Sequence, residues 1–178
     1  LAIHPKTPRT WFIAAASGGV WKTTNAGTTF TPVFDAQSTY SIGAITIDPN
    51  NPNVIWVGSG ENNYQRAVGY GDGVFKSIDG GATWKNVGLK KSEHIGRIVI
   101  DPKDSDVAYV AAQGPAWNGG GERGLYKTTD GGVTWARILG GGEWVGVNDV
   151  QMDPRNPKIL LATTQVRQRR VWGQVSGG

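Results

Sequence analysis

Short runs in which apolar and polar residues alternate cover most of the chain and predict β-strands. The clearest pair is 74–77 and 83–87, Val-Phe-Lys-Ser and Thr-Trp-Lys-Asn-Val, separated by Asp79-Gly80-Gly81. Alternation with period two marks half-buried strands, and Asp-Gly or Gly-Gly between two such runs is typical of a β-hairpin. No helix start signal is followed by a convincing 3.6-residue period. The chain is therefore predicted to be all-β.

This hairpin recurs along the chain. The stretch 73–84 returns at 124–135, and a divergent copy stands at 19–30. Asp130 follows Asp79 by 51 positions, and Asp79 follows Asn25 by 54. A second phrase keeps the same spacing: His4-Pro5, Asp48-Pro49, Asp101-Pro102 and Asp153-Pro154. Self-similarity at roughly 40–50 residues indicates a β-propeller or another stacked array.

The repeat predicts blades of four antiparallel strands. They divide the chain at about 1–37, 38–91, 92–142 and 143–178, the last being the start of a fourth blade. A closed propeller needs roughly four to eight blades. We therefore expect a partial β-propeller within one domain, completed by the remaining blades of the same propeller or by another chain.

Two segments match a known motif. Residues 77–84 and 128–135, called the box turns below, both fit the Asp-box or BNR repeat, Ser/Thr-x-Asp-x-Gly-x-Thr-Trp. This motif is found in sialidases, sortilin-type propellers and two-propeller xyloglucanases. The chain most resembles bacterial sortilin-like Asp-box proteins, which are loosely labelled glycosyl hydrolases. The resemblance implies a structural role, away from the functional face, for Asp79, Gly81, Thr83, Trp84, Asp130, Gly132, Thr134 and Trp135.

Strand order sorts the connections onto two faces. The short turns between the first two strands of each blade share one face with the box turns. The long irregular connections share the opposite face, called the loop face below: 59–72, 113–123, 165–173, 34–42, 88–95 and 140–146. Irregular loops on a rigid scaffold commonly carry function.

Several loop-face residues are candidates for ligand binding. Asn62, Asn63, Tyr64 and Arg66 bring hydrogen-bonding groups and a ring that can stack on a sugar or peptide. The alternative is a surface loop packed on itself. Exposed tryptophan suits a carbohydrate platform, which adds Trp117, although packing between blades is also an ordinary use of tryptophan.

The start of the inner strands offers a second group of candidates. His94, Arg97, Asn148 and Asp149 lie at the mouth of the expected axial channel, where they could hold an anionic ligand or perform acid–base chemistry. The alternative is a salt bridge of Arg97 with Asp149 or Glu143.

One basic and aromatic cluster stands near the end of the chain. Its members, Arg167, Arg169, Arg170 and Trp172, could hold phosphate, sulfate or a carboxylated glycan. The alternative is a solvated surface.

Catalysis of glycoside hydrolysis requires two carboxylates that flank the bond. The candidates are Glu61, Asp149 and Glu143, although none stands in a pattern that identifies an acid or a base. In the xyloglucanase family, the phrase Arg-Thr-Asp-Val-Gly-Gly carries a catalytic Asp, and the matching phrase here has Ala16 at that place. A sialidase needs three arginines around a carboxylate, and the context of Arg66, Arg97 and Arg167 does not support that arrangement.

Composition narrows the classes of function. The net charge is +4 and the pI about 9.4, without any motif that reads nucleic acid. There is no cysteine, and His4 and His94 are isolated, so we expect no metal and no cofactor. No apolar run is long enough to span a membrane.

Two hypotheses of function follow. The first is a non-catalytic binding or scaffolding module for a glycan or peptide, in an exported bacterial protein that the resemblance places outside the cell or in the periplasm. The alternative is a glycoside hydrolase of the sialidase or xyloglucanase-like Asp-box type, with catalytic residues partly outside this stretch.

Overall fold

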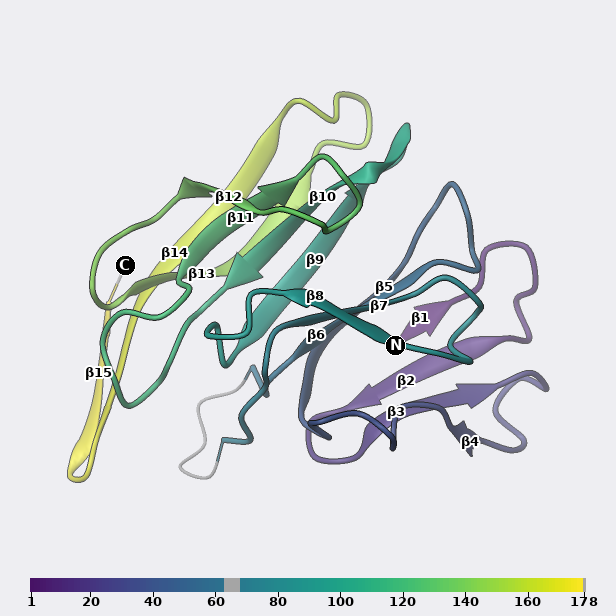
Figure 1. Ribbon diagram of the computed structural model, residues 1–178, viewed down its shortest axis with the longest axis horizontal. Coiled ribbons are helices and arrows are strands. Elements are labelled where there is room, and N and C mark those ends of the chain that lie inside the picture. The colour runs from purple at the N-terminus through teal and green to yellow at the C-terminus, as the bar shows by residue number, and fades with distance from the viewer. Residues whose placement is uncertain (63–67, 178) are drawn as a thin grey trace.

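The computed structural model describes residues 1–62 and 68–177. Within these residues, fifteen strands form four antiparallel sheets that lie side by side, with the N-terminus in the first sheet and the C-terminal strands in the last (Figure 1). Asn63, Tyr64 and Arg66 lie outside the described residues. No helix that could cross a membrane is found in the described part of the chain.

Three sheets have four strands each, in sequential order. The first blade contains β1 (Ala2–Ile3), β2 (Trp11–Ala15), β3 (Gly19–Thr23) and β4 (Thr31–Pro32). The second contains β5 (Ile42–Ile47), β6 (Ile55–Ser59), β7 (Val74–Ser77) and β8 (Lys85–Gly88). The third contains β9 (Ile95–Asp101), β10 (Asp104–Ala112), β11 (Gly124–Thr128) and β12 (Ala136–Leu139). The prediction of an all-β chain with four-stranded antiparallel sheets is confirmed.

The fourth sheet differs from the expected pattern. It contains β13 (Val145–Met152), β14 (Leu160–Arg170) and β15 (Gly173–Gly177). We expected an irregular loop at 165–173, and this was wrong, because β14 continues to Arg170 and pairs with β15 from Val166 onward. The continuation is held by backbone bonds to neighbouring loops, from Arg167 N to Trp144 O and from Arg169 N to Ala116 O.

Side-chain hydrogen bonds fix the box turns. Asp79 accepts bonds from the Thr83 amide at 2.9 Å and the Thr83 hydroxyl at 2.5 Å, while Ser77 Oγ accepts from Gly81 N at 2.9 Å. Gly80 and Gly81 have φ of 69° and 88°, which side-chain-bearing residues rarely adopt. The bonds from Thr83 hold the pKa of Asp79 at about 2. The equivalent bonds from Thr134 hold the pKa of Asp130 at about 2.

Each box turn also locks its blade onto the preceding one. Trp84 Nε1 donates to Val33 O at 2.7 Å, and Trp135 Nε1 donates to Val87 O at 2.8 Å. In the opposite direction, Lys76 Nζ lies over the Trp56 ring and donates to Gly131 O at 3.0 Å. The repeated sequence therefore produces a repeated contact between blades.

The hydrophobic core lies between the sheets in three successive clusters. Phe12, Phe34 and Phe75 fill the space between the first two blades. The other two clusters lie between the second and third blades, around Trp56, and between the third blade and the fourth sheet, around Tyr109. This packing holds the strand ends, and therefore the loops, in fixed positions.

Backbone bonds confirm the sorting of connections onto two faces. On one face, the box turns bond the first turn of their own blade, from Gly80 N to Asn53 O and from Gly131 N to Asp106 O. On the loop face, irregular segments bond one another, from Gly71 N to Glu93 O and from Gln113 N to His94 O. The loop face is thus one connected surface.

Candidate functional site

A network of amide side chains joins three sheets on the loop face. Gln113, which follows β10, donates through Nε2 to Asn62 Oδ1 from the second blade and to Asn148 Oδ1 on β13. Its Oε1 accepts a bond from Arg167 Nη1 on β14. Gln113 and Arg167 are buried, whereas Asn62 is exposed and Asn148 is half-buried. The network places two amides where a ligand can reach them.

A second arginine organises the loop at 113–123. Arg123 is buried and donates to four backbone carbonyls, those of Gln113, Pro115, Asn118 and Gly120. Its guanidinium also lies 5.6 Å from the centre of the Trp144 ring, which contacts Arg170 at 5.9 Å. Trp144 is therefore a packing residue held between two cations, and Arg123 shapes the loop that carries Trp117.

His94 lies beneath this surface. It is fully buried, and neither ring nitrogen makes a hydrogen bond of normal geometry within the described residues. The ring of Tyr70, itself exposed, lies 5.9 Å away. Burial and the charge of Arg167 lower the pKa of His94 to about 4. His94 is thus neutral at pH 7 and is covered rather than presented to solvent.

Arg97 and Asp149 face each other across the inner strands β9 and β13. Arg97 Nε donates to Asp149 Oδ1 at 2.8 Å, so the ion pair that we considered as an alternative is present. Partial burial alone would raise the pKa of Asp149, but hydrogen bonds from Arg97 and Gln151 outweigh it and lower the pKa. The pair bridges the third blade and the fourth sheet, and Arg97 remains about half exposed.

The three candidate carboxylates are in different situations. Glu61 is buried and accepts a bond from Gly69 N at 3.0 Å, which closes the base of its own loop. Asp149 is paired with Arg97, and Glu143 is exposed beside Gly119. No group of three or more metal-ligating side chains is present in residues 1–62 and 68–177. The described residues thus offer polar binding groups more clearly than an acid–base pair.

The basic cluster divides into buried and exposed parts. Arg167 is only 3% exposed and Arg169 is half-buried, whereas Arg170 is exposed and Trp172 is 84% exposed. The exposed members stand at the tip of the β14–β15 hairpin. Exposed rings are also found at Trp117 and Tyr70. Rings of this kind stack on apolar faces of ligands, and those of Tyr70, Trp117 and Trp172 belong to three separate segments of the loop face.

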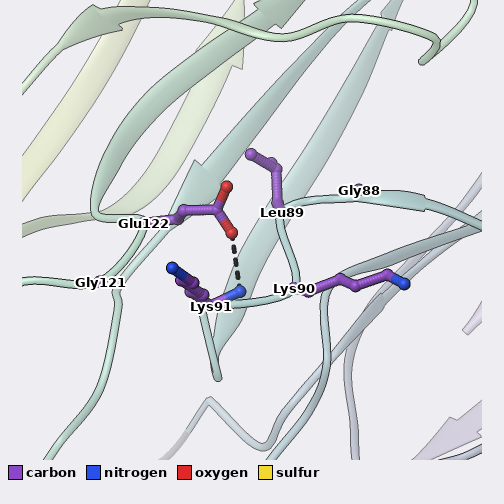
Figure 2. A pocket seen from close by; sticks show the side chains of 6 residues that line it. All are labelled: Gly88, Leu89, Lys90, Lys91, Gly121 and Glu122. Atoms are coloured by element: carbon purple, nitrogen blue, oxygen red, sulfur yellow. Dashed lines mark hydrogen bonds between the residues drawn. The ribbon is translucent and has the colours of Figure 1, made fainter.

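Two cavities open near these residues. One, of about 510 Å³, is lined by Asn148 together with Thr163, Thr164, Gln165, Ser176 and Gly177. The other, of about 580 Å³, lies between the connections at 88–91 and 121–122 (Figure 2). There Glu122 accepts a bond from Lys91 N at 2.7 Å, and the Lys90 side chain extends away from the Glu122 carboxylate. Volumes of 300–1,000 Å³ are usual for small-ligand sites.

Sequence reasoning missed Gln113 and Arg123. Both stand at the ends of the segment 113–123, which was expected to be a functional loop, but neither side chain was singled out. The only local signal was a long polar side chain at each strand end. Gln113 acts through partners far along the chain, since Asn62 lies 51 positions away. Arg123 instead bonds backbone carbonyls three to ten positions away in its own loop.

Comparison with known sequences shows that the chain is similar to one class of enzyme. No protein-family model matches the chain. It is 27% identical over 154 residues to a xyloglucanase of Hypocrea jecorina, covering 78% of this chain and 17% of the relative. It is 26% identical over 142 residues to a xyloglucanase of Acetivibrio thermocellus, covering 71% of this chain and 16% of the relative. The chain thus spans about a sixth of the length of these curated relatives.

Solved structures agree on the fold. The GH74 enzyme of Niastella koreensis is similar with a TM-score of 0.71 and 26% identity, covering 94% of this chain and 24% of that chain. The GH74 xyloglucanase of Xanthomonas campestris has a TM-score of 0.67 at 20% identity, covering 99% of this chain and 27% of that one. These neighbours are β-propeller enzymes, so the predicted partial β-propeller is confirmed. The homologues are xyloglucanases, and they favour the glycoside hydrolase hypothesis over the non-catalytic one.

Proposed function

We propose that this chain is part of a β-propeller enzyme that hydrolyses xyloglucan, and that its loop face contributes to binding the polysaccharide. The observation that carries the proposal is the sequence similarity to xyloglucanases over most of the chain. An enzyme of this kind would act outside the cytoplasm, which agrees with the extracellular or periplasmic location expected from the sequence.

The loop face supports the binding part of this proposal. A saccharide presents hydroxyl and ring oxygens for hydrogen bonding and apolar faces for stacking. The exposed rings of Trp117 and Trp172 suit the apolar faces, and the amides of Asn62 and Asn148 suit the oxygens. The cavity beside Asn148, which is lined by hydroxyl groups, lies in the same region.

The catalytic carboxylates are proposed to lie at least partly in the rest of the propeller. In this chain, Glu61 and Asp149 are engaged in structural bonds, and Ala16 stands where the xyloglucanase phrase has its Asp. Exposed apolar residues on the outermost sheets, such as Leu161 at 74%, support the packing of further blades there. The same Ala16 observation favours the competing hypothesis, a glycan-binding module without hydrolysis.

Titration of this chain with xyloglucan oligosaccharides tests the proposal. Calorimetry is expected to give saturable binding that weakens about tenfold in Trp117→Ala, because stacking on one ring contributes roughly 1–1.5 kcal/mol. Phe30→Ala is the matched control, since Phe30 is similarly exposed (37% against 39%) but belongs to the turn region of the first blade. It should leave affinity unchanged.

Absence of binding by the unaltered chain would overturn the proposed contribution of the loop face. Release of reducing ends, measured in the same solutions, separates the two hypotheses of function. A protein that contains this chain with its remaining blades should hydrolyse xyloglucan. If it binds the polysaccharide without cleaving it, the binding-module hypothesis holds instead.

A further inference from the structure

Three polar side chains, one from the second blade and two from the fourth sheet, converge on the side-chain amide of Gln113. Arg167 donates to its Oε1, and its Nε2 donates to Asn62 and to Asn148. Because Gln113 is buried, its amide depends on protein partners rather than on water for hydrogen bonding. These contacts determine which way each amide of the network is turned.

Arg167 determines the orientation of the Gln113 side-chain amide. A guanidinium carries only hydrogen-bond donors, so the Gln113 atom that faces it has to be the oxygen. The Gln113 NH₂ group is then directed to the other side, toward the two asparagines. An NH₂ group carries only donors, so Asn62 and Asn148 both have to present their oxygens to it.

The planar geometry of an amide then places both asparagine NH₂ groups on the side away from Gln113. For Asn62, this nitrogen lies against the second inner-strand residue of the third blade, 3.1 Å from the position that a Cβ on Gly96 would occupy. Asn148 lines the cavity of about 510 Å³. Gly96 and Asn148 both belong to inner strands, so these nitrogens lie at the axial end of the loop face.

We propose that Gln113 is the positioning residue that turns the Asn62 and Asn148 amide N–H groups toward the ligand and makes this part of the loop face a hydrogen-bond donor surface for saccharide oxygens. The inference rests on the proposed function, since it assigns a role within the same glycan site. Gln113 itself does not touch the saccharide. It acts through the orientation of the two amides.

A single substitution is expected to change this surface from a hydrogen-bond donor to a hydrogen-bond acceptor. In Gln113→Glu the carboxylate still accepts from Arg167, but it has no hydrogen for the asparagines. Both asparagine amides then gain by turning their NH₂ groups inward, which leaves their oxygens facing the ligand. Two donor contacts are lost, and at about 1 kcal/mol each this corresponds to roughly a thirtyfold loss of affinity.

The experiment combines calorimetry with NMR of the side-chain amides of the ¹⁵N-labelled chain. Titration with xyloglucan oligosaccharides is expected to shift the Asn62 and Asn148 NH₂ signals in the unaltered protein and to leave them unshifted in Gln113→Glu. Asn53→Asp, which makes the same change of charge in an exposed turn on the face opposite the loop face, is the control and should bind normally. The NMR signals report orientation, which a merely structural role of Gln113 would not change.

A second variant keeps the test valid if Gln113→Glu does not fold. Asn148→Asp retains an oxygen for Gln113 but removes the outward NH₂ group, and it should weaken binding about fivefold. Failure of the unaltered chain to bind would overturn the proposed function and this role with it. Normal affinity in both Gln113→Glu and Asn148→Asp, with the unaltered chain binding, would overturn the role of Gln113 alone.

Discussion

The indole nitrogen of Trp135 donates a hydrogen bond of 2.8 Å to the backbone carbonyl of Val87 in the preceding blade. The Trp135 ring also meets the buried Trp56 ring edge to face, with centroids 6.2 Å apart. One side chain thus satisfies a polar group and fills space in the neighbouring sheet. Because Trp84 makes the equivalent bond to Val33, this is the repeating unit of blade-to-blade stability.

Truncation of Trp135 should therefore loosen the third blade. We expect Trp135→Ala to lower the free energy of unfolding by about 3 kcal/mol, since it leaves a cavity against Trp56, and Trp135→Phe to lower it by about 1 kcal/mol through loss of the hydrogen bond. Urea unfolding followed by circular dichroism measures both. Trp172→Ala, at an exposed tip, should change it by less than about 0.5 kcal/mol. Equal effects of all three substitutions would contradict this account.

The box turns predict sensitivity to acid. Hydrogen bonds from Thr134 lower the pKa of Asp130 to about 2 from 3.8, so the unfolded chain binds a proton at higher pH than the folded one. The stabilisation is complete above about pH 4 and is lost as the pH falls toward 2. The urea midpoint should fall over this range, and more gently in Asp130→Asn, where no titrating group remains. If the urea midpoint of Asp130→Asn falls as steeply with pH as that of the unaltered protein, Asp130 does not contribute to the acid sensitivity.

Local chemistry made much of the fold predictable from the sequence. The turn at Asp79 is determined by residues within five positions, and its repetition reveals the blades. The continuation of β14 to Arg170 was not predictable by the same logic. There the repeat favours a loop, and the strand persists because Arg169 N bonds Ala116 O in a distant segment.

The candidate site was harder to predict than the fold, because more of its contacts join residues that are far apart in the sequence. The ion pair of Arg97 with Asp149 could be considered in advance because both residues were expected near the start of inner strands in adjacent repeats. The network of Gln113 could not, since its partners lie 51, 35 and 54 positions away and meet only when three sheets are packed. Polar residues that join different sheets leave no periodic signal in the sequence.

Gly60 is predicted to be indispensable for the loop face. Its φ is 88°, and a Cβ at this position would lie 1.7 Å from the backbone oxygen of Glu93. Gly60→Ala must therefore push the backbone at Gly60 away from that of Glu93 and His94, and we expect a fall of several °C in the thermal midpoint together with weaker glycan binding. Gly173→Ala is the control, since a Cβ there meets no atom within 4 Å. A Gly60→Ala protein with an unaltered midpoint would show that the two segments can separate without cost.

His94 gives the last prediction, a loss of stability between mildly acidic and acidic pH. Burial and the charge of Arg167 lower its pKa to about 4, against 6.5 for the free side chain. His94 is therefore protonated near pH 6.5 in the unfolded chain but only near pH 4 in the folded chain. The free energy of unfolding is therefore highest above pH 6.5 and declines as the pH falls. The neutral His94 ring contributes about 3 kcal/mol to the free energy of unfolding above pH 6.5, and this contribution is lost toward pH 4. It should appear as a falling urea midpoint between pH 6.5 and 4, whereas the Asp130 effect belongs to the range below about pH 4.

The imidazole signals in NMR separate this origin from others. In the folded protein the His94 ring should keep the chemical shifts of a neutral imidazole down to about pH 4. His94→Gln should remove the decline between pH 6.5 and 4 whatever its effect on stability at pH 7. If His94 instead titrates near 6.5, the ring is open to water, and Tyr70 does not seal the surface above it.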